Sequence, residues 1–208
     1  MNTRLIVVHD PMCSWCWGFA PVLARITSEL DGKLPIEKYL GGLAPDSDQP
    51  MPENMMQSLE QTWQHIQHRI PGTEFNFSFW TDCKPRRSTY PACRAVIAAR
   101  QQGHEFDDLM TRRLQEAYYT EAKNPSDIST HIELASELGL DADRFSNDLK
   151  SDFVNQTLID EMNYSRSIGI DSFPSLAVEV DGQFTGIPLN YTDADEMLAN
   201  INRAAGIG

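Results

Sequence analysis

The apolar positions of this chain fall into short runs near its two ends and into helical spacing between them. Close to the N-terminus, residues 5–9 are a continuous apolar and β-branched run of strand length, and residues 36–40 fit a second strand that Gly41-Gly42 ends. Residues 13–30, between them, have the length and spacing of a helix, which Pro21 should kink. The N-terminal part therefore predicts a β-α-β unit.

The C-terminal part predicts a hairpin followed by a helix. Residues 175–180 are apolar and rich in β-branched side chains, Asp181-Gly182 is a strong two-residue hairpin signal, and residues 183–187 return. The run Thr192-Asp193-Ala194-Asp195 resembles a capping box, so we expect a last helix from there to residue 205. The chain therefore finishes as β-β-α.

The middle of the chain is predominantly helical by its pattern. Residues 73–80 alternate polar and aromatic side chains and should be extended. Helices are expected at residues 54–70, 90–102, 105–121, 126–138 and 143–168. The last of these is one long helix or a broken one. The prediction is an α/β protein in which residues 1–53 and 170–208 form a sheet domain and residues 54–169 an inserted, all-helical domain.

The composition is that of an ordinary globular protein, with 41% hydrophobic and 23% charged residues. The 17 basic residues face 30 acidic ones, so the formal net charge is −13. This acidity argues against a nucleic acid or an anionic membrane as partner, since both attract positive charge. No secretory signal and no stretch of roughly 18–20 apolar residues is recognisable, so we expect a cytoplasmic location.

Cys13-Ser14-Trp15-Cys16 is the most informative motif, because it follows the first predicted strand and opens the first helix. Free N–H groups at a helix start carry partial positive charge and lower the pKa of a nearby thiol. In the cytoplasm such a pair is more often catalytic or metal-binding than structural. We expect Cys13 to be the more exposed thiol and the nucleophile, and Cys16 to resolve the mixed disulfide.

These features resemble the thioredoxin fold and, within it, the DsbA-like thiol–disulfide oxidoreductases. The matching residues are the Cys-x-x-Cys motif after the first strand, Pro21 in the following helix, and Phe173-Pro174 before the third strand. The helical insertion is the layout of the DsbA-like group. The resemblance implies an enzyme that exchanges disulfides with proteins or peptides. It implies no cofactor beyond the redox-active disulfide, with glutathione as a candidate donor.

A narrower resemblance comes with departures from the family pattern. The run from Pro11 to Phe19, with Gly41-Gly42-Leu43 later, is similar to a cytoplasmic bacterial subfamily described as predicted protein-disulfide isomerases. Thioredoxin's buried carboxylate would fall at Val7, where this chain has no acid. Proton transfer must then use another group, such as Asp10 or water.

The resemblance also implies roles for residues around the two thiols. Ser14 and Trp15 should tune the thiolate rather than carry the chemistry. Neither brings a positive charge, so the N–H groups at the helix start should stabilise the thiolate, and Pro174 adds no competing ligand for it. The Phe173-Pro174 bond, expected to be cis, should leave the Phe173 backbone open to an extended substrate. Trp15 either contacts apolar substrate or packs within the protein. His9 is either a charged neighbour of the thiols or a core residue.

Cys83 and Cys93 allow three interpretations. They are a second redox pair, or they complete a four-thiolate zinc site with Cys13 and Cys16, or they are unrelated core and loop thiols. Their spacing fits no common zinc-binding pattern, which favours a core Cys93 and a loop Cys83. We therefore expect no metal site.

Two other function classes stay open from the sequence. Glutathione transferases of the kappa class and chromene-carboxylate isomerases also insert helices into a thioredoxin domain, but they use a single Ser or Cys, so Cys16 argues against them. A non-catalytic zinc-binding or disulfide-sensing module is the other class. The direction of exchange is not fixed by these residues, because the redox poise of the compartment decides between reduction, oxidation and isomerisation.

Overall fold

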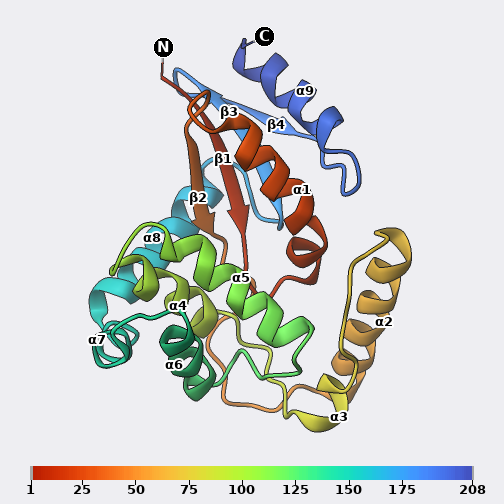
Figure 1. Cartoon of the computed structure of the whole chain (residues 1–208), viewed down its shortest axis with the longest axis vertical. Coiled ribbons are helices and arrows are strands. Elements are labelled where there is room, and N and C mark those ends of the chain that lie inside the picture. The colour runs from red at the N-terminus through yellow and green to blue at the C-terminus, as the bar shows by residue number, and fades with distance from the viewer. Residues whose placement is uncertain (1, 208) are drawn as a thin grey trace.

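The computed structural model describes residues 2–207 and has the predicted α/β architecture (Figure 1). Within these residues one sheet has the strand order β2-β1-β3-β4. The strands are β1 (Thr3–His9), β2 (Ile36–Leu40), β3 (Ser175–Val180) and β4 (Gln183–Ile187). β1 is parallel to β2 and antiparallel to β3, and β3 is antiparallel to β4. The sheet therefore joins the two ends of the chain, and the predicted thioredoxin-like start and finish are confirmed.

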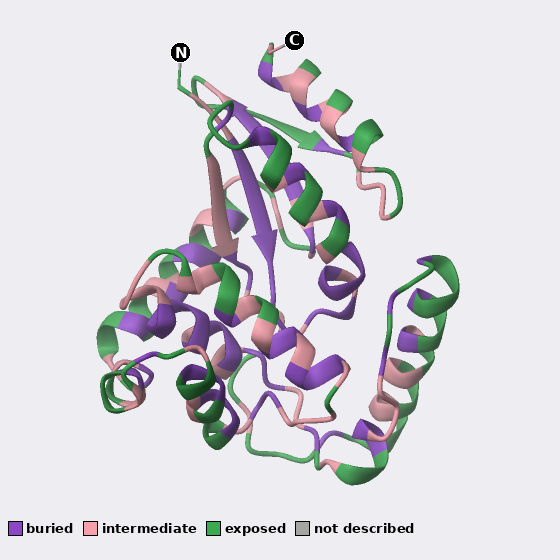
Figure 2. Cartoon of the chain, in the orientation of Figure 1, coloured by how far each residue is buried: buried purple, intermediate pink, exposed green. Residues whose placement is uncertain are grey.

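Two helices cover one face of the sheet. α1 (Ser14–Leu30) lies in front of the strands in Figure 1, and α9 (Ala194–Ala205) lies beside it. Leu5 and Val7 of β1 are fully buried in the apolar cluster that both helices share. Figure 2 shows the outward face of α1 exposed and β1 buried. This packing fixes the start of α1 at the end of β1.

Seven helices lie between β2 and β3 in the sequence. They are α2 (Glu53–Arg69), α3 (Phe79–Asp82), α4 (Tyr90–Arg100), α5 (Phe106–Tyr119), α6 (Ile128–Glu137), α7 (Ala142–Asp148) and α8 (Asp152–Ser167). Helices α4 to α8 surround an apolar cluster of their own. The predicted domain boundaries at residues 54 and 169 stay a prediction. No helix among the described residues is both long and apolar enough to cross a bilayer.

Helix α2 belongs to a separate aromatic cluster that reaches the first helix. Trp63 of α2 is surrounded by six aromatic rings, those of Phe75, Phe77, Phe79, Trp80, Tyr118 and Tyr119. Trp17 of α1 stacks on Tyr119 with 5.7 Å between ring centroids. Figure 1 shows α2 standing apart from α4 to α8. The aromatic cluster therefore holds α2 beside the first turns of α1.

The prediction of an extended segment at residues 73–80 is wrong. The structure has no strand there, and the segment ends in the short helix α3. Its aromatic side chains pack around Trp63 instead of facing a neighbouring strand. The alternation of polar and aromatic residues thus reflects packing in a loop.

Of the two forms expected for residues 143–168, the structure has the broken one, since α8 starts anew where the Ser151 side chain accepts a hydrogen bond from the Val154 N–H. The cap of α9 is Asp193, one residue later than the capping box predicted, and it accepts from the Glu196 N–H at 2.9 Å. The hairpin prediction is confirmed, because Asp181 and Gly182 both have positive φ.

Candidate active site

Cys13 is the N-cap residue of α1. Its backbone is extended, with φ −82° and ψ 116°, and the helix begins at Ser14, which is buried. The Cys13 carbonyl accepts a hydrogen bond from the Trp17 N–H at 3.1 Å, and the Cys13 N–H donates to the Asp10 carbonyl at 3.0 Å. Cys13 therefore lies beside the free N–H groups of the first helical turn.

The two thiols are buried to the same extent, so the prediction that Cys13 is the more exposed is wrong. Each is 6% exposed. They differ in ionisation instead. The pKa of Cys13 is lowered, because its sulfur accepts hydrogen bonds from the Cys16 thiol and from nearby backbone N–H groups. Burial, together with this contact to Cys13, raises the pKa of Cys16. Cys13 is therefore the better thiolate and Cys16 the better proton carrier.

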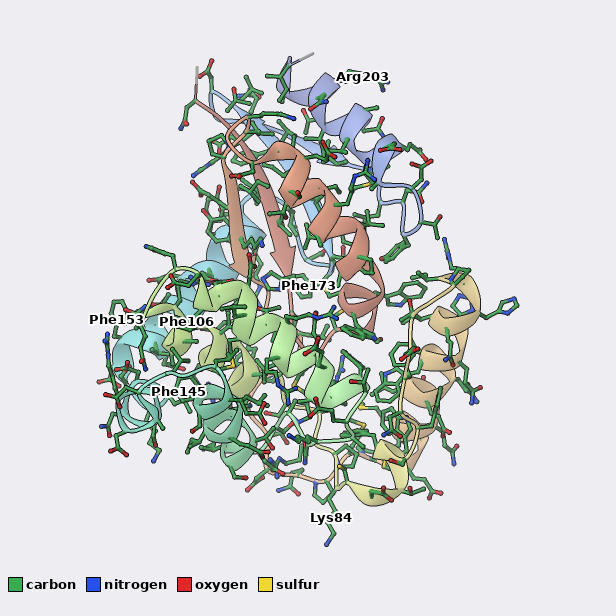
Figure 3. The ribbon with its side chains drawn as sticks, viewed as in Figure 1. Lys84, Phe106, Phe145, Phe153, Phe173 and Arg203 are labelled. Carbon is green, nitrogen blue, oxygen red and sulfur yellow. The ribbon has the colours of Figure 1, made fainter. Side chains whose placement is uncertain are left out.

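The Phe173-Pro174 peptide bond is cis, as the sequence analysis expected. The thiol of Cys13 donates to the Phe173 carbonyl at 3.4 Å, which explains why Cys13 is covered. Figure 3 labels Phe173 beside α1, near the centre of the molecule. The loop before β3 thus brings a backbone acceptor to the nucleophile from a position 160 residues away.

Trp15 is packed on several sides but remains partly exposed. Its ring meets the edges of His65, at 5.8 Å between centroids, and Tyr191, at 5.2 Å. The Arg69 guanidinium lies 5.8 Å from the Trp15 ring centroid. Trp15 therefore packs within the protein, against α2 and the loop before α9, as one of the two interpretations expected. Contact with substrate through the remaining exposed surface stays a prediction.

Asp10 anchors the segment that leads into the thiols. The carboxylate is fully buried and accepts hydrogen bonds from the Met12 and Leu43 N–H groups at 2.8 and 2.7 Å, and from the Thr89 hydroxyl at 2.7 Å. The Cys93 thiol lies 3.5 Å from the same carboxylate. With four donors around it, the Asp10 carboxylate acts as a structural anchor. Sequence reasoning missed this role because Thr89 and Cys93 are far away in the chain.

Cys83 and Cys93 lie in different surroundings. Cys93 is fully buried in the cluster of α4 to α8, and burial raises its pKa well above the ordinary value. Cys83 is partly exposed, and its thiol donates to the Ala122 carbonyl at 3.0 Å. In residues 2–207 no group of three or more His, Cys, Asp or Glu side chains is placed to hold a metal ion. The arrangement agrees with a core thiol and a loop thiol.

His9 is a buried neighbour of the site. It is 6% exposed, and burial lowers the pKa of its imidazole. A charged His9 that favours the Cys13 thiolate is therefore not supported. Val7, at the place of thioredoxin's carboxylate, is fully buried and apolar. Val7 therefore cannot take over the proton transfer that thioredoxin's carboxylate performs.

Comparison with known proteins places this geometry in a wider group. A family model described as Thioredoxin matches residues 7–198. A solved structure of a candidate protein disulfide isomerase from Nitrosomonas europaea is 26% identical, with a TM-score of 0.84 over 98% of this chain and 97% of that one. The cytosolic disulfide reductase DsbM from Pseudomonas aeruginosa is 24% identical, with a TM-score of 0.79 over 96% and 97% of the two chains.

A curated relative is found by sequence as well. The ClpXP adapter protein SpxH of Bacillus subtilis is 24% identical over 80% of this chain. The match covers 55% of SpxH, so the chain spans about half the length of the curated relatives it matches.

Proposed function

Because the chain belongs to the thioredoxin family, we propose that it is a thiol–disulfide oxidoreductase that acts on protein or peptide substrates through Cys13 and Cys16. One observation carries the proposal: within one helical turn, the pKa of Cys13 is lowered and that of Cys16 is raised. A nucleophile and a resolving thiol need this difference, whereas a structural cysteine pair does not.

The reaction has two steps. The Cys13 thiolate attacks one sulfur of a substrate disulfide, and the bond between the two substrate sulfurs breaks. The sulfur that was not attacked leaves with the electron pair and takes a proton, and the attacked sulfur stays bonded to Cys13 as a mixed disulfide. Cys16 then loses its proton and its sulfur bonds to the Cys13 sulfur, while the bond from Cys13 to the substrate breaks and that substrate sulfur leaves with the electron pair. The protein dithiol becomes a disulfide and the substrate gains two electrons, while the reverse order oxidises a substrate dithiol.

Phe173 and Pro174 would hold the substrate. The Phe173 carbonyl is 3.4 Å from the Cys13 sulfur, so it lies next to any substrate sulfur that bonds there. Backbone groups pair with an extended segment whatever its sequence, which suits an enzyme with many protein substrates. The exposed part of the Trp15 ring adds an apolar contact, and Ser14 and Trp15 tune the thiolate through the first turn of α1.

The cytosol is the proposed compartment and glutathione the proposed reductant of the Cys13–Cys16 disulfide. The support is the fold neighbour DsbM, which is described as cytosolic and has also been solved with glutathione. In a reducing compartment the net direction is reduction or isomerisation of substrate disulfides.

Trapping of the mixed disulfide tests the proposal. A Cys16→Ser variant cannot complete the second step, so it should accumulate partners bound to Cys13 when it is purified after acid quenching and alkylation. The Cys13→Ser/Cys16→Ser double variant should release them all, and Cys83→Ser added to Cys16→Ser should change nothing. Equal capture by the double variant would refute the proposal. Glutathione recovered on Cys13 would support its role as donor.

A further inference from the structure

A cavity of about 590 Å³ opens beside the thiols, between α1 and α5. Figure 1 shows these two helices on either side of the ends of β1 and β2. Cys16 and Pro174 line the cavity at the active site, and His9 and Lys38 line it from the sheet. The resolving thiol and the buried imidazole therefore face one shared space that is large enough for several water molecules.

His9, which lines this cavity, has a polar side-chain atom without a hydrogen-bond partner. Its Nε2 is buried and has no hydrogen-bond partner among residues 2–207. Asp107 of α5 is in the same condition, because its Oδ2 accepts from Arg100 while its Oδ1 is buried and has no partner in the described chain. Of the charged groups around His9, Asp107 acts on it most strongly. A buried polar group without a partner destabilises a fold, so two of them close to the active site are candidates for a functional role.

The second step of the exchange needs an acceptor for the Cys16 proton, and His9 can be that acceptor. Cys16 must lose its proton before it attacks the mixed disulfide, and Asp10 already accepts four hydrogen bonds. Val7 and His9 are two positions apart on β1, so their side chains point to the same face of the sheet. His9 thus offers a titratable group two residues beyond the position where thioredoxin has its acid.

We propose that His9 accepts the proton of Cys16, through water in the cavity, when Cys16 attacks the mixed disulfide at Cys13. This inference rests on the proposed function. The Cys16–Cys13 sulfur bond forms, the bond from Cys13 to substrate breaks, and the electron pair leaves on the substrate sulfur. The Cys16 proton is then on His9, whose imidazolium faces Asp107 and afterwards returns the proton to water or to the leaving thiolate.

The charges around His9 suit a group that is neutral at rest. Burial lowers the pKa of the imidazole, so the ring is neutral at neutral pH and one of its nitrogens keeps a lone pair that can accept a proton. Asp107 and Asp108 of α5 and Asp10 after β1 raise this pKa, and Lys38 of β2 lowers it. Lys38 is itself paired with Asp108. The acidic neighbours therefore stabilise the imidazolium once it forms.

The two thiol steps can be watched separately with dithiobis(nitrobenzoate), in a Cys83→Ser background. Attack by Cys13 releases one coloured thiolate, and the later attack by Cys16 releases a second. His9→Asn and His9→Asp have nearly the same shape, but only Asp accepts a proton. At neutral pH we expect His9→Asn to slow the second release by about tenfold or more and to leave the first unchanged. His9→Asp should restore most of the rate.

The outcomes distinguish this inference from the function on which it rests. The rates of His9→Asn and the parent should converge at alkaline pH, where Cys16 ionises without help. Thr27→Val removes a hydroxyl from a different residue that lines the cavity, and it should change neither release. An unchanged second release in His9→Asn, or equal slowing in His9→Asn and His9→Asp, would overturn the inference. If the parent protein gave neither release, the proposed function itself would fail.

Discussion

The ring of Phe173 packs so closely on the backbone of Gly41 that a methyl group at residue 41 would overlap three ring carbons. Gly41 follows β2, and its N–H donates to the His9 carbonyl at 2.8 Å. The Phe173 carbonyl in turn contacts the Cys13 thiol. The position of the backbone that faces the substrate thus depends on the absence of a side chain at residue 41.

Replacing Gly41 by Ala should therefore impair exchange with protein substrates. The added methyl displaces the Phe173 ring and with it the carbonyl beside Cys13. We expect the rate of insulin reduction to fall by about tenfold or more, since small displacements of reacting groups are costly. Gly186→Ala is the matched control, because a methyl there meets nothing within 4 Å. Equal rates for the two variants would show that Phe173 does not position the substrate.

The rates at which Cys13 and Cys83 are alkylated should depend differently on pH. The pKa of Cys13 is lowered by its hydrogen bonds, and that of Cys83 is raised by burial. As pH rises, Cys13 becomes a thiolate first, so its reaction with iodoacetamide should accelerate over a lower pH range than that of Cys83. Mass spectrometry of quenched samples follows both sites in one protein. Coincident pH profiles would contradict the assignment of Cys13 as the nucleophile.

His131 should account for part of the loss of folding stability at acid pH. It is fully buried in α6, its Nε2 lies 2.8 Å from the Pro125 carbonyl, and burial lowers its pKa to about 4. In the unfolded chain a histidine has a pKa of about 6.5, so the unfolded state binds more protons as pH falls from about 6.5. The stabilisation is complete above that pH and is lost toward about pH 4, to the extent of about 3 kcal/mol.

The His131→Gln variant tests this directly. Urea unfolding of the variant across that pH window should show a free energy of unfolding that falls less steeply than in the wild type. His68→Gln, on the exposed surface of α2, is the control and should keep the wild-type slope. A wild-type slope in His131→Gln would mean that another group dominates the acid limb.

The parts of the fold that sequence predicted well are those with a local cause. The bounds of β2, β3 and β4 agree with the prediction because glycine-containing turns delimit them: Gly41-Gly42 ends β2, and Asp181-Gly182 joins β3 to β4. The Cys-x-x-Cys pair at a helix start is likewise a local pattern. The prediction for residues 73–80 is wrong because their aromatic side chains pack around Trp63, which lies in α2.

The parts of the site that sequence could not predict depend on contacts between distant segments. The hydrogen bonds to Asp10 could not be predicted, because Thr89, the N-cap of α4, and Cys93 within α4 are both far from Asp10 in the sequence. The equal burial of Cys13 and Cys16 follows from the loop at Phe173, which no local pattern places against α1. Neither contact leaves a periodic trace in the sequence.

Disulfide exchange by Cys13 and Cys16 is tested most directly by the reduction of insulin with glutathione as the electron source. The wild type and the Cys83→Ser variant should reduce insulin at the same rate, because Cys83 lies outside the site. Cys13→Ser should have no activity above the uncatalysed background. A Cys13→Ser variant that reduces insulin as fast as the wild type, or a wild type that does not reduce it at all, would contradict the account.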